Sequence, residues 1–337
     1  MSNLQPPDAP PSPVFGSSQR AGERPAAPLL VFDIETVPDI PLMMAGYDPQ
    51  QPAGQTFNKE RDWAELSFVH LIREQKQISF PPPIYHAVIC ICAVFVHPET
   101  HMIVDGFKRT IPVCSSYEEF LSAEAELLRE FWSFSTKHAH AARIWYDNIQ
   151  SDYRMSDYQR KKLKPLPLTF CGYNITGFDL PVIEQRSMKH FISCPIPEYG
   201  REFGYDSYRS RYAFDKSFDL AQFVNGNASQ KIGLDILAQS MGLAGKLEGM
   251  DGSQVADAYF GQAATQLIED YCAVDVLITY GVYLGIQKFR GILDPAHFAD
   301  CARHFERFLR HESRPSTYRD LADQSQDFFK KSQLQHS

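Results

Sequence analysis

The sequence contains no run of about 18 or more apolar residues, so we expect no transmembrane helix. Its seven cysteines include no CxxC pair, and its eleven histidines show no zinc-ligand spacing with cysteine. A structural zinc site is therefore not expected. The N-terminus has no basic start followed by an apolar stretch, which argues against a secretory signal. Unpaired cysteines such as Cys90 and Cys92, in an apolar run, are expected as buried free thiols in a reducing, cytoplasmic compartment.

Positive charge is also scarce. The 337 residues carry 33 Lys and Arg against 41 Asp and Glu, a formal net charge of −8. This excludes a protein that holds nucleic acid by bulk positive charge alone. A nuclease whose metal ions supply positive charge locally remains compatible with the sequence.

Composition divides the chain into three parts. We expect a disordered Pro/Ser-rich segment over residues 1–27, which contains six prolines. Residues 28–291 carry the regular apolar patterns, interrupted by a polar, basic insertion at about 138–165. Residues 292–337 are expected to form a helical extension that frays into a polar tail from about Asp327.

Hydrophobic periodicity predicts alternating strands and helices. Ser116 is the expected N-cap of the first predicted helix, and Glu119 follows three residues further on. The expected strands are 29–32, 87–97, its hairpin partner 102–109, 168–173 and 218–224. The expected helices start near Ser116 and cover 178–190, 231–241 and 263–289. This order predicts an α/β fold, a mixed sheet with helices on both faces.

Acidic residues form the first chemical motif. Asp33 and Glu35 lie two residues apart after the apolar run Leu29 to Phe32, so both side chains project from one face of a strand. Such a triplet also arises by chance as two solvated acids. Its place at the end of a buried strand favours a functional role, because such strands commonly deliver functional groups at their carboxyl ends.

Asn174, Phe178 and Asp179 form the second motif, at a strand-to-helix turn. A capping box between Thr176 and Asp179 would explain the acid. It leaves Asn174 and Phe178 unexplained. Phe178 is either a core residue or a ring that stacks on a terminal base, and Asn174 either holds the loop or binds substrate.

Tyr271 and Asp275 form the third motif. Their spacing places the phenol and the carboxylate on one face of the long predicted helix. Tyr153 and Asp157 have the same spacing but lie in the polar insertion, without apolar periodicity around them. A buried acid in the packed helix requires a partner. Taken alone, however, the pair of Tyr271 and Asp275 could also be structural.

Taken together, the motifs predict a metal site. Four converging carboxylates repel one another strongly unless divalent cations lie between them. Two hard cations about 3.5–4 Å apart, held by carboxylate oxygens, catalyse in-line attack on a phosphodiester. A nearby tyrosine can orient the attacking water.

The segments FDIET (32–36), YNxxxFD (173–179) and YxxxD (271–275) resemble the three motifs of the DEDD superfamily of 3′–5′ exonucleases. The tyrosine four residues before Asp275 corresponds to the tyrosine subgroup. More narrowly, the chain resembles predicted 3′–5′ exonucleases related to the proofreading domain of family-B DNA polymerases. The stretches 80–83, 229–235 and 249–253 support the likeness, which covers roughly residues 28–291.

This resemblance implies a ribonuclease H-like fold and two Mg²⁺ or Mn²⁺ ions. It implies that the metal ligands are Asp33, Glu35, Asp179 and Asp275, and that Tyr271 positions the water. The expected substrate-binding residues are Thr36, Asn174, Phe178 and Lys231, and Arg209 and Arg211 are further candidates for phosphate contacts. The expected partner is nucleic acid with a free 3′ end, single-stranded and with DNA favoured over RNA, and no membrane.

Two alternatives stay open at this point. One is an endonuclease of the same fold, which has no need of Tyr271. The other is a catalytically inactive nucleic-acid-binding or scaffold protein on a nuclease fold. An inactive protein should have lost at least one acid, whereas all four and the tyrosine are present.

Overall fold

The structure, a computed structural model, describes residues 28–47, 57–150, 156, 168–196, 199, 207–210, 213–226, 228, 231–245, 250 and 252–334. The segment 1–27, the residues Tyr153 and Asp157, most of the basic stretch after residue 150, and Arg211 lie outside the described residues.

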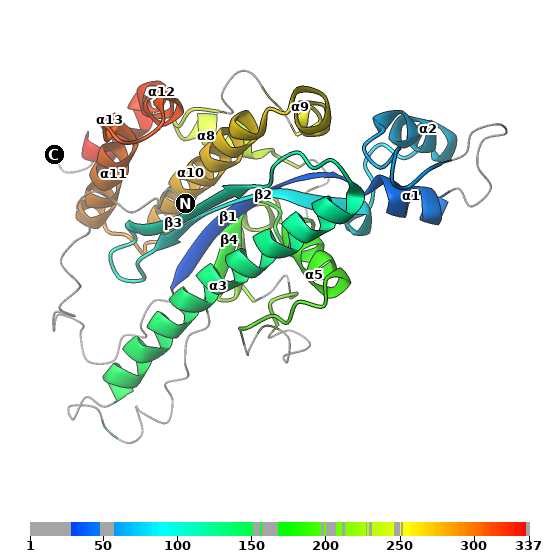
Figure 1. The fold of residues 1–337 in the computed structure, drawn as a ribbon. Helices are drawn as coiled ribbons and strands as arrows, with labels where there is room; N and C mark the ends of the chain where they lie inside the picture. The colour runs from blue at the N-terminus through cyan, green and yellow to red at the C-terminus, as the bar shows by residue number, and fades with distance from the viewer. Residues whose placement is uncertain are drawn as a thin grey trace.

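A five-stranded mixed sheet forms the centre of the molecule (Figure 1), in the order β3-β2-β1-β4-β5. Antiparallel pairs join β1 to β2 and β2 to β3, and parallel pairs join β1 to β4 and β4 to β5. This is the ribonuclease H-like arrangement that the resemblance implied. The strands are β1 (Leu29–Pro38), β2 (His86–Val96), β3 (Ile103–Thr110), β4 (Thr169–Gly172) and β5 (Ser217–Asp219).

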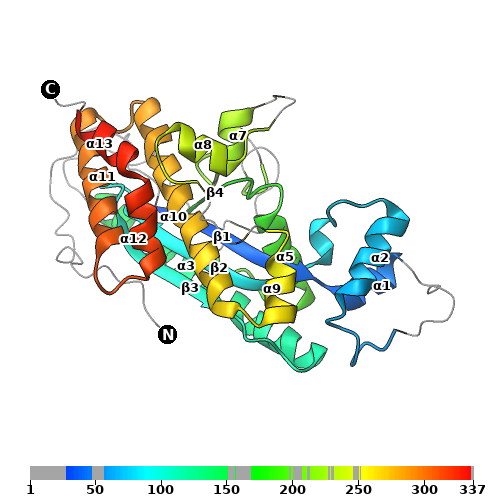
Figure 2. The same ribbon diagram turned by 90° about the horizontal axis from the view of Figure 1, so that it is seen from above.

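Helices cover both faces of the sheet. Helices α3 (Tyr117–Gln150) and α5 (Asp179–Lys189) lie on one face, and α10 (Thr265–Phe289) lies across the other, with α8 (Leu234–Ser240) and α9 (Val255–Gln262) beside it (Figure 1). The view from above shows α10 running along β1 and β2 (Figure 2). All eleven residues of β2 are buried, as expected for a strand covered on both faces.

Two further groups of helices lie at the two ends of the sheet (Figure 2). At one end, α1 and α2 pack through a small apolar cluster of their own that includes Ile40, Met43 and Phe68. At the other end lie three C-terminal helices. The helices of these two groups are α1 (Ile40–Tyr47), α2 (Leu66–Lys76), α11 (Pro295–Arg310), α12 (Ser316–Gln324) and α13 (Gln326–Leu334). Two short helices complete the described elements, η1 (Pro83–Tyr85) and α7 (Leu220–Asn225).

The structure corrects three expectations about the elements. The expected fraying tail is wrong over residues 327–334, because α13 buries Phe328 and Phe329 in the core. The expected strand 218–224 ends at Asp219, whose side chain accepts a hydrogen bond from the Gln222 amide and starts α7. Up to Gln150, the stretch expected as a polar, basic insertion continues helix α3.

Strand β1 is also longer than expected, so Asp33 and Glu35 lie within it and not at its end. Its parallel pairing with β4 stops at Val31, whereas its antiparallel pairing with β2 continues to Pro38. A register irregularity falls between Glu35 and Thr36. Bulges of this kind re-aim side chains and are common beside functional sites.

Among the described residues, we find no helix with the length and apolar character needed to cross a membrane.

Candidate active site

One cleft of about 530 Å³ brings the three sequence motifs together. Asp33 and Glu35 come from β1, Asp179 from the start of α5, and Tyr271 and Asp275 from α10. All five predicted catalytic residues line this cleft. Residues separated by more than 200 positions in the sequence therefore share one site.

The acid pair of β1 faces α10. Asp33 lies opposite Cys92 of β2 in the antiparallel register, and Glu35 lies opposite Cys90. Cys272 of α10 completes the contact, because its Sγ lies 3.4 Å from the Asp33 carbonyl oxygen and 3.8 Å from Asp33 Oδ2. Glu35 is nearly buried, at 7% exposure.

The turn between β4 and α5 positions Asp179. Asn174 adopts a left-handed conformation with φ 65°, which asparagine tolerates better than most residues. Its carbonyl oxygen accepts hydrogen bonds from the amides of Gly177 (3.0 Å) and Phe178 (3.1 Å). A Cβ at Gly177 would lie 2.7 Å from Asn174 Oδ1, so a larger residue there would displace the Asn174 side chain.

The capping box between Thr176 and Asp179, the alternative considered from sequence, does not form. The Thr176 hydroxyl instead donates to Asp219 Oδ2 at 2.6 Å, and Phe178 occupies the N-cap position of α5 without a side-chain cap. Asp219 also accepts from the Asn174 amide at 2.9 Å. The side chain of Asp219, in the neighbouring strand β5, therefore holds the turn that follows β4.

The surroundings of Asp179 strongly shift the pKa of its carboxyl group. Burial raises its pKa to about 7, and the nearby charge of Asp219 adds to the rise. A hydrogen bond from the backbone of Ile34 only partly opposes this shift in pKa. A carboxyl group with this pKa is only partly ionised at neutral pH, and a cation beside it would favour the ionised form.

Tyr271 lies in the same field of negative charge. Burial raises the pKa of its hydroxyl far above the usual value, and the charges of Asp275, Glu35 and Asp33 raise it further. A hydrogen bond to the Asp275 carboxylate acts in the same direction. The phenol is therefore neutral at any working pH and can act through hydrogen bonds.

The residues of the cleft fit divalent metal ions. The four acids offer oxygen donors, which Mg²⁺ and Mn²⁺ prefer. The described residues that line the cleft include no lysine, arginine or histidine. Bound cations would therefore relieve the repulsion among the four acids. Asp33, Glu35, Asp179 and Asp275 are the residues that would hold such ions.

The expected substrate-binding residues separate into two groups. Asn174 and Phe178 line the cleft. Phe178 is half-buried, packs edge-on against His86 at a centroid distance of 4.9 Å and lies 5.3 Å from the exposed ring of Phe80. Asn174 and Phe178 therefore both make structural contacts, which was one of the two interpretations of the sequence. Both also line the cleft, as the other interpretation requires.

Thr36 and Lys231 do not line this cleft. Thr36 lies in an adjoining cavity of about 190 Å³, where its hydroxyl is 2.9 Å from Nδ1 of His86. Lys231 is exposed, next to Ile232, whose carbonyl oxygen accepts the hydroxyl of Tyr173 at the cleft wall. Arg209 forms an exposed ion pair with Glu184 at 2.9 Å.

Sequence reasoning did not assign a role to several residues of the site. Asp219 was signalled by its place before a short helix, a pattern typical of an N-cap. Phe80 and the prolines 81–83 line the cleft. Cys272 gave no local signal, because its neighbours in the site come from distant strands.

Comparisons with known proteins match part of this chain to one family and show a similarity to one solved structure. A family described as "Predicted 3'-5' exonuclease related to the exonuclease domain of PolB" matches residues 155–330. No curated protein matches the chain. Among solved structures, the family B DNA polymerase from the hyperthermophilic archaeon Pyrobaculum calidifontis is similar, with 14% sequence identity and a TM-score of 0.42. The similar region covers 86% of this chain and 30% of that polymerase chain.

Proposed function

Because the chain belongs to the family of predicted 3′–5′ exonucleases related to the exonuclease domain of PolB, we propose that it is an active, metal-dependent exonuclease. Its substrate is single-stranded nucleic acid with a free 3′ end, DNA in preference to RNA. The reaction hydrolyses the terminal phosphodiester bond and releases 5′-mononucleotides.

One observation carries this proposal. Four carboxylates and one phenol, from β1, α5 and α10, converge on a single cleft of about 530 Å³. A purely structural role would not require so many like charges in one place, since each pair costs stability unless a cation compensates it. The endonuclease alternative does not account for Tyr271.

The proposal assigns Asp33, Glu35, Asp179 and Asp275 as ligands of two Mg²⁺ or Mn²⁺ ions. When bound, these ions neutralise the phosphodiester and promote ionisation of the attacking water. The chain's own contribution is to fix the acids on a strand, a helix start and a second helix, all packed on one core. Rigid elements hold catalytic groups more precisely than loops do.

Tyr271 orients the attacking water in this proposal. Its pKa is too high for it to serve as a base, so it acts as a neutral hydrogen-bonding group. Phe178 and Phe80 offer ring faces for the terminal base, a contact that tolerates any sequence. Asn174 offers a side-chain amide at the cleft wall, and Thr36 and Lys231 remain candidates for contacts further along the strand.

The experiment that tests this function is digestion of end-labelled single- and double-stranded DNA and RNA after removal of metal with EDTA. We expect no products in EDTA, and mononucleotides with a 5′ phosphate after Mg²⁺ or Mn²⁺ is added back. Calcium should support binding with little turnover, because it tolerates looser geometry.

Two results would overturn parts of the proposal. Full activity in EDTA would contradict the metal requirement. Retained binding without products under every metal would favour the inactive nucleic-acid-binding alternative. A circular single strand serves as the control for end-dependence, since cleavage of a strand without ends would indicate an endonuclease.

A further inference from the structure

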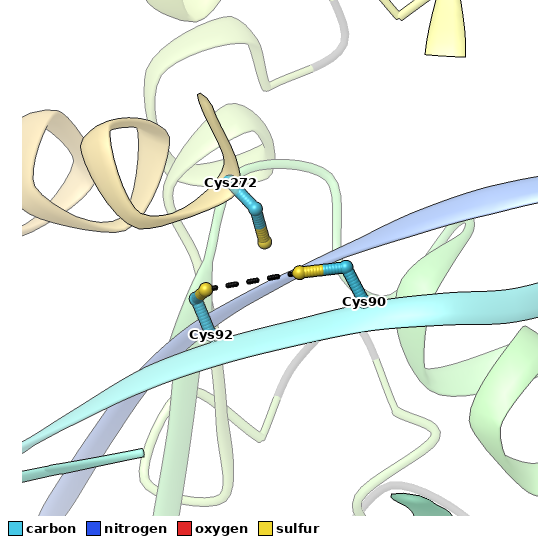
Figure 3. A group of neighbouring side chains, drawn as sticks. All are labelled: Cys90, Cys92 and Cys272. Atoms are coloured by element: carbon cyan, nitrogen blue, oxygen red, sulfur yellow. Dashed lines mark hydrogen bonds between the residues drawn. The ribbon is translucent and has the colours of Figure 1, made fainter. Parts of the chain in front are cut away.

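A cluster of three cysteines lies directly beside the candidate active site. Cys90 and Cys92 project from the same face of β2, and Cys272 reaches them from α10 (Figure 3). Their Sγ atoms all lie within 4.8 Å of one another, and Cys90 and Cys92 are 3.9 Å apart. All three residues are buried at 1% exposure or less.

The spacing of these sulfur atoms matches a known coordination geometry. Three thiolates bound tetrahedrally to zinc at about 2.3 Å have sulfur atoms about 3.8 Å apart. The distance between Cys90 and Cys92 is close to this value, and small side-chain rotations would bring the third sulfur to it. Thiolates select soft or borderline ions such as Zn²⁺ over Mg²⁺.

Two oxygen atoms lie close to the sulfur atoms of the cluster. The Glu269 carbonyl oxygen lies 3.6 Å from Cys92 Sγ, and Oδ2 of Asp33 lies 3.8 Å from Cys272 Sγ. Asp33, Glu35 and Cys272 form a second group whose ligand atoms also lie within 4.8 Å of one another. Cys272 therefore stands between a sulfur cluster and an oxygen cluster.

We propose that Cys90, Cys92 and Cys272 bind one thiophilic metal ion, Zn²⁺ or an ion of similar chemistry, at a site separate from the carboxylate site. Binding breaks three S–H bonds, forms three metal–sulfur bonds and releases three protons to solvent. The fourth position is filled by an oxygen ligand, the backbone carbonyl of Glu269. The ion ties α10 to β2, and so holds the helix that carries Tyr271 and Asp275 on the sheet.

The competing interpretation is that the three thiols are ordinary small core residues. The two interpretations differ in whether a metal binds with thiolate ligation. Cobalt(II) separates them, because cobalt–thiolate bonds produce a strong near-ultraviolet charge-transfer absorption that cobalt–carboxylate bonds do not. This measurement also does not depend on nuclease activity.

The test uses the full chain, reduced and stripped of metal, titrated with Co²⁺ without oxygen. We expect the charge-transfer absorption to saturate at one ion per chain and to disappear when Zn²⁺ is added. The Cys272→Ser variant should lose most of it. The matched control is Cys171→Ser, because Cys171 is a fully buried cysteine of β4 outside the cluster, and this variant should keep the absorption.

Absence of the absorption at saturating Co²⁺, or its equal loss in the Cys171→Ser variant, would overturn the proposal. If Cys272→Ser fails to fold, Cys92→Ser replaces it in the cobalt titration. The ¹¹³Cd chemical shift of the wild-type protein reports the number of sulfur ligands directly. Asp275→Asn should keep the absorption, because Asp275 belongs to the carboxylate site alone. Failure of the nuclease assay with this absorption intact would therefore count against the proposed function and not against the thiolate site.

Discussion

Arg186 of α5 and Glu124 of α3 form a fully buried ion pair, with Nε 2.7 Å from Oε1. Burial alone would raise the pKa of Glu124, but the charges and hydrogen bonds of Arg186 and His190 together outweigh it and hold that pKa below its usual value. Nη1 of Arg186 also reaches Asp39, the residue that follows β1, at 2.5 Å. One guanidinium thus fixes the helix that carries Asp179 against the strand that carries Asp33 and Glu35.

Replacing Arg186 with methionine should lower the free energy of unfolding by about 3–5 kcal/mol, because two buried carboxylates would lose the guanidinium between them and keep only Lys189 and His190 as partners. Chemical denaturation measures this change. Arg209→Met is the control, since Arg209 is exposed and its ion pair with Glu184 should contribute about 0–1 kcal/mol. Equal losses in the two variants would show that the buried pair does not organise the fold.

Asp33→Asn and Asp275→Asn should each reduce exonuclease turnover by at least about 10³-fold, because bound metal ions stabilise the transition state by several kcal/mol. The measurement is release of mononucleotides from a labelled single strand at saturating Mn²⁺. Asp235→Asn is the control, since Asp235 lies on α8, accepts a hydrogen bond from Gln239 at 3.2 Å and does not line the cleft. Wild-type turnover in Asp33→Asn would refute the ligand assignment.

Tyr271→Phe should fold normally and bind metal and substrate, yet lose about 10²–10⁴-fold in rate, the usual range for a positioned proton-handling or water-orienting group. Single-turnover kinetics at saturating substrate measure this loss. Tyr153→Phe has the same sequence spacing to an acid and should change nothing. If Tyr153→Phe were the slow variant, the third motif would be misplaced.

Asp179 should give the metal-free protein a distinctive pH dependence of stability. Its pKa is about 7 in the folded protein, against about 3.9 in an unfolded chain. Between these values the folded state binds more protons, so the contribution of Asp179 to stability rises as the pH falls from about 8 to about 5.

Thermal unfolding in EDTA checks this expectation. The Asp179→Asn variant lacks the titration, so it should be more stable than the wild type at about pH 8, and the difference should shrink toward about pH 5. Adding Mg²⁺ at the higher pH should stabilise the wild type and not the variant. Parallel pH profiles for the two proteins would contradict the shifted pKa.

The end-dependence of the reaction gives a further expectation. A strand that ends in a 3′ phosphate should resist digestion, because the cleft is expected to accept a free 3′ hydroxyl beside four acids. A matched strand with a 3′ hydroxyl is the control, and gel analysis of both measures the difference. Equal rates would mean that the cleft does not read the terminal hydroxyl.

Much of the candidate site could be predicted from sequence because its signals are local. The i, i+2 spacing of Asp33 and Glu35 fixes a shared face of a strand, and the i, i+4 spacing of Tyr271 and Asp275 fixes a shared face of a helix. Helix α10 and the strands β2, β3 and β4 were predicted near their observed bounds for the same reason. Periodicity is a property of a few neighbouring residues.

The features that sequence missed depend on distant contacts. The residues 327–334 look polar along the chain, and only packing on α11 and α12 shows that Phe328 and Phe329 belong to the core. Thr176 has a local partner available in Asp179, but the hydrogen bond to Asp219 of β5 replaces it. Such competition between a local and a distant partner is decided by the tertiary fold.

By itself, the sequence determined the α/β pattern and pointed to the five candidate residues of the site, because both follow from short-range spacing. Only the tertiary structure decided that these residues share a cleft, and that burial raises the pKa of Asp179 and of Tyr271. It alone brings Cys272 to Cys90 and Cys92, which are about 180 positions away in the chain. The physical reason is that desolvation and metal-ligand geometry depend on distances in space, which sequence spacing does not give.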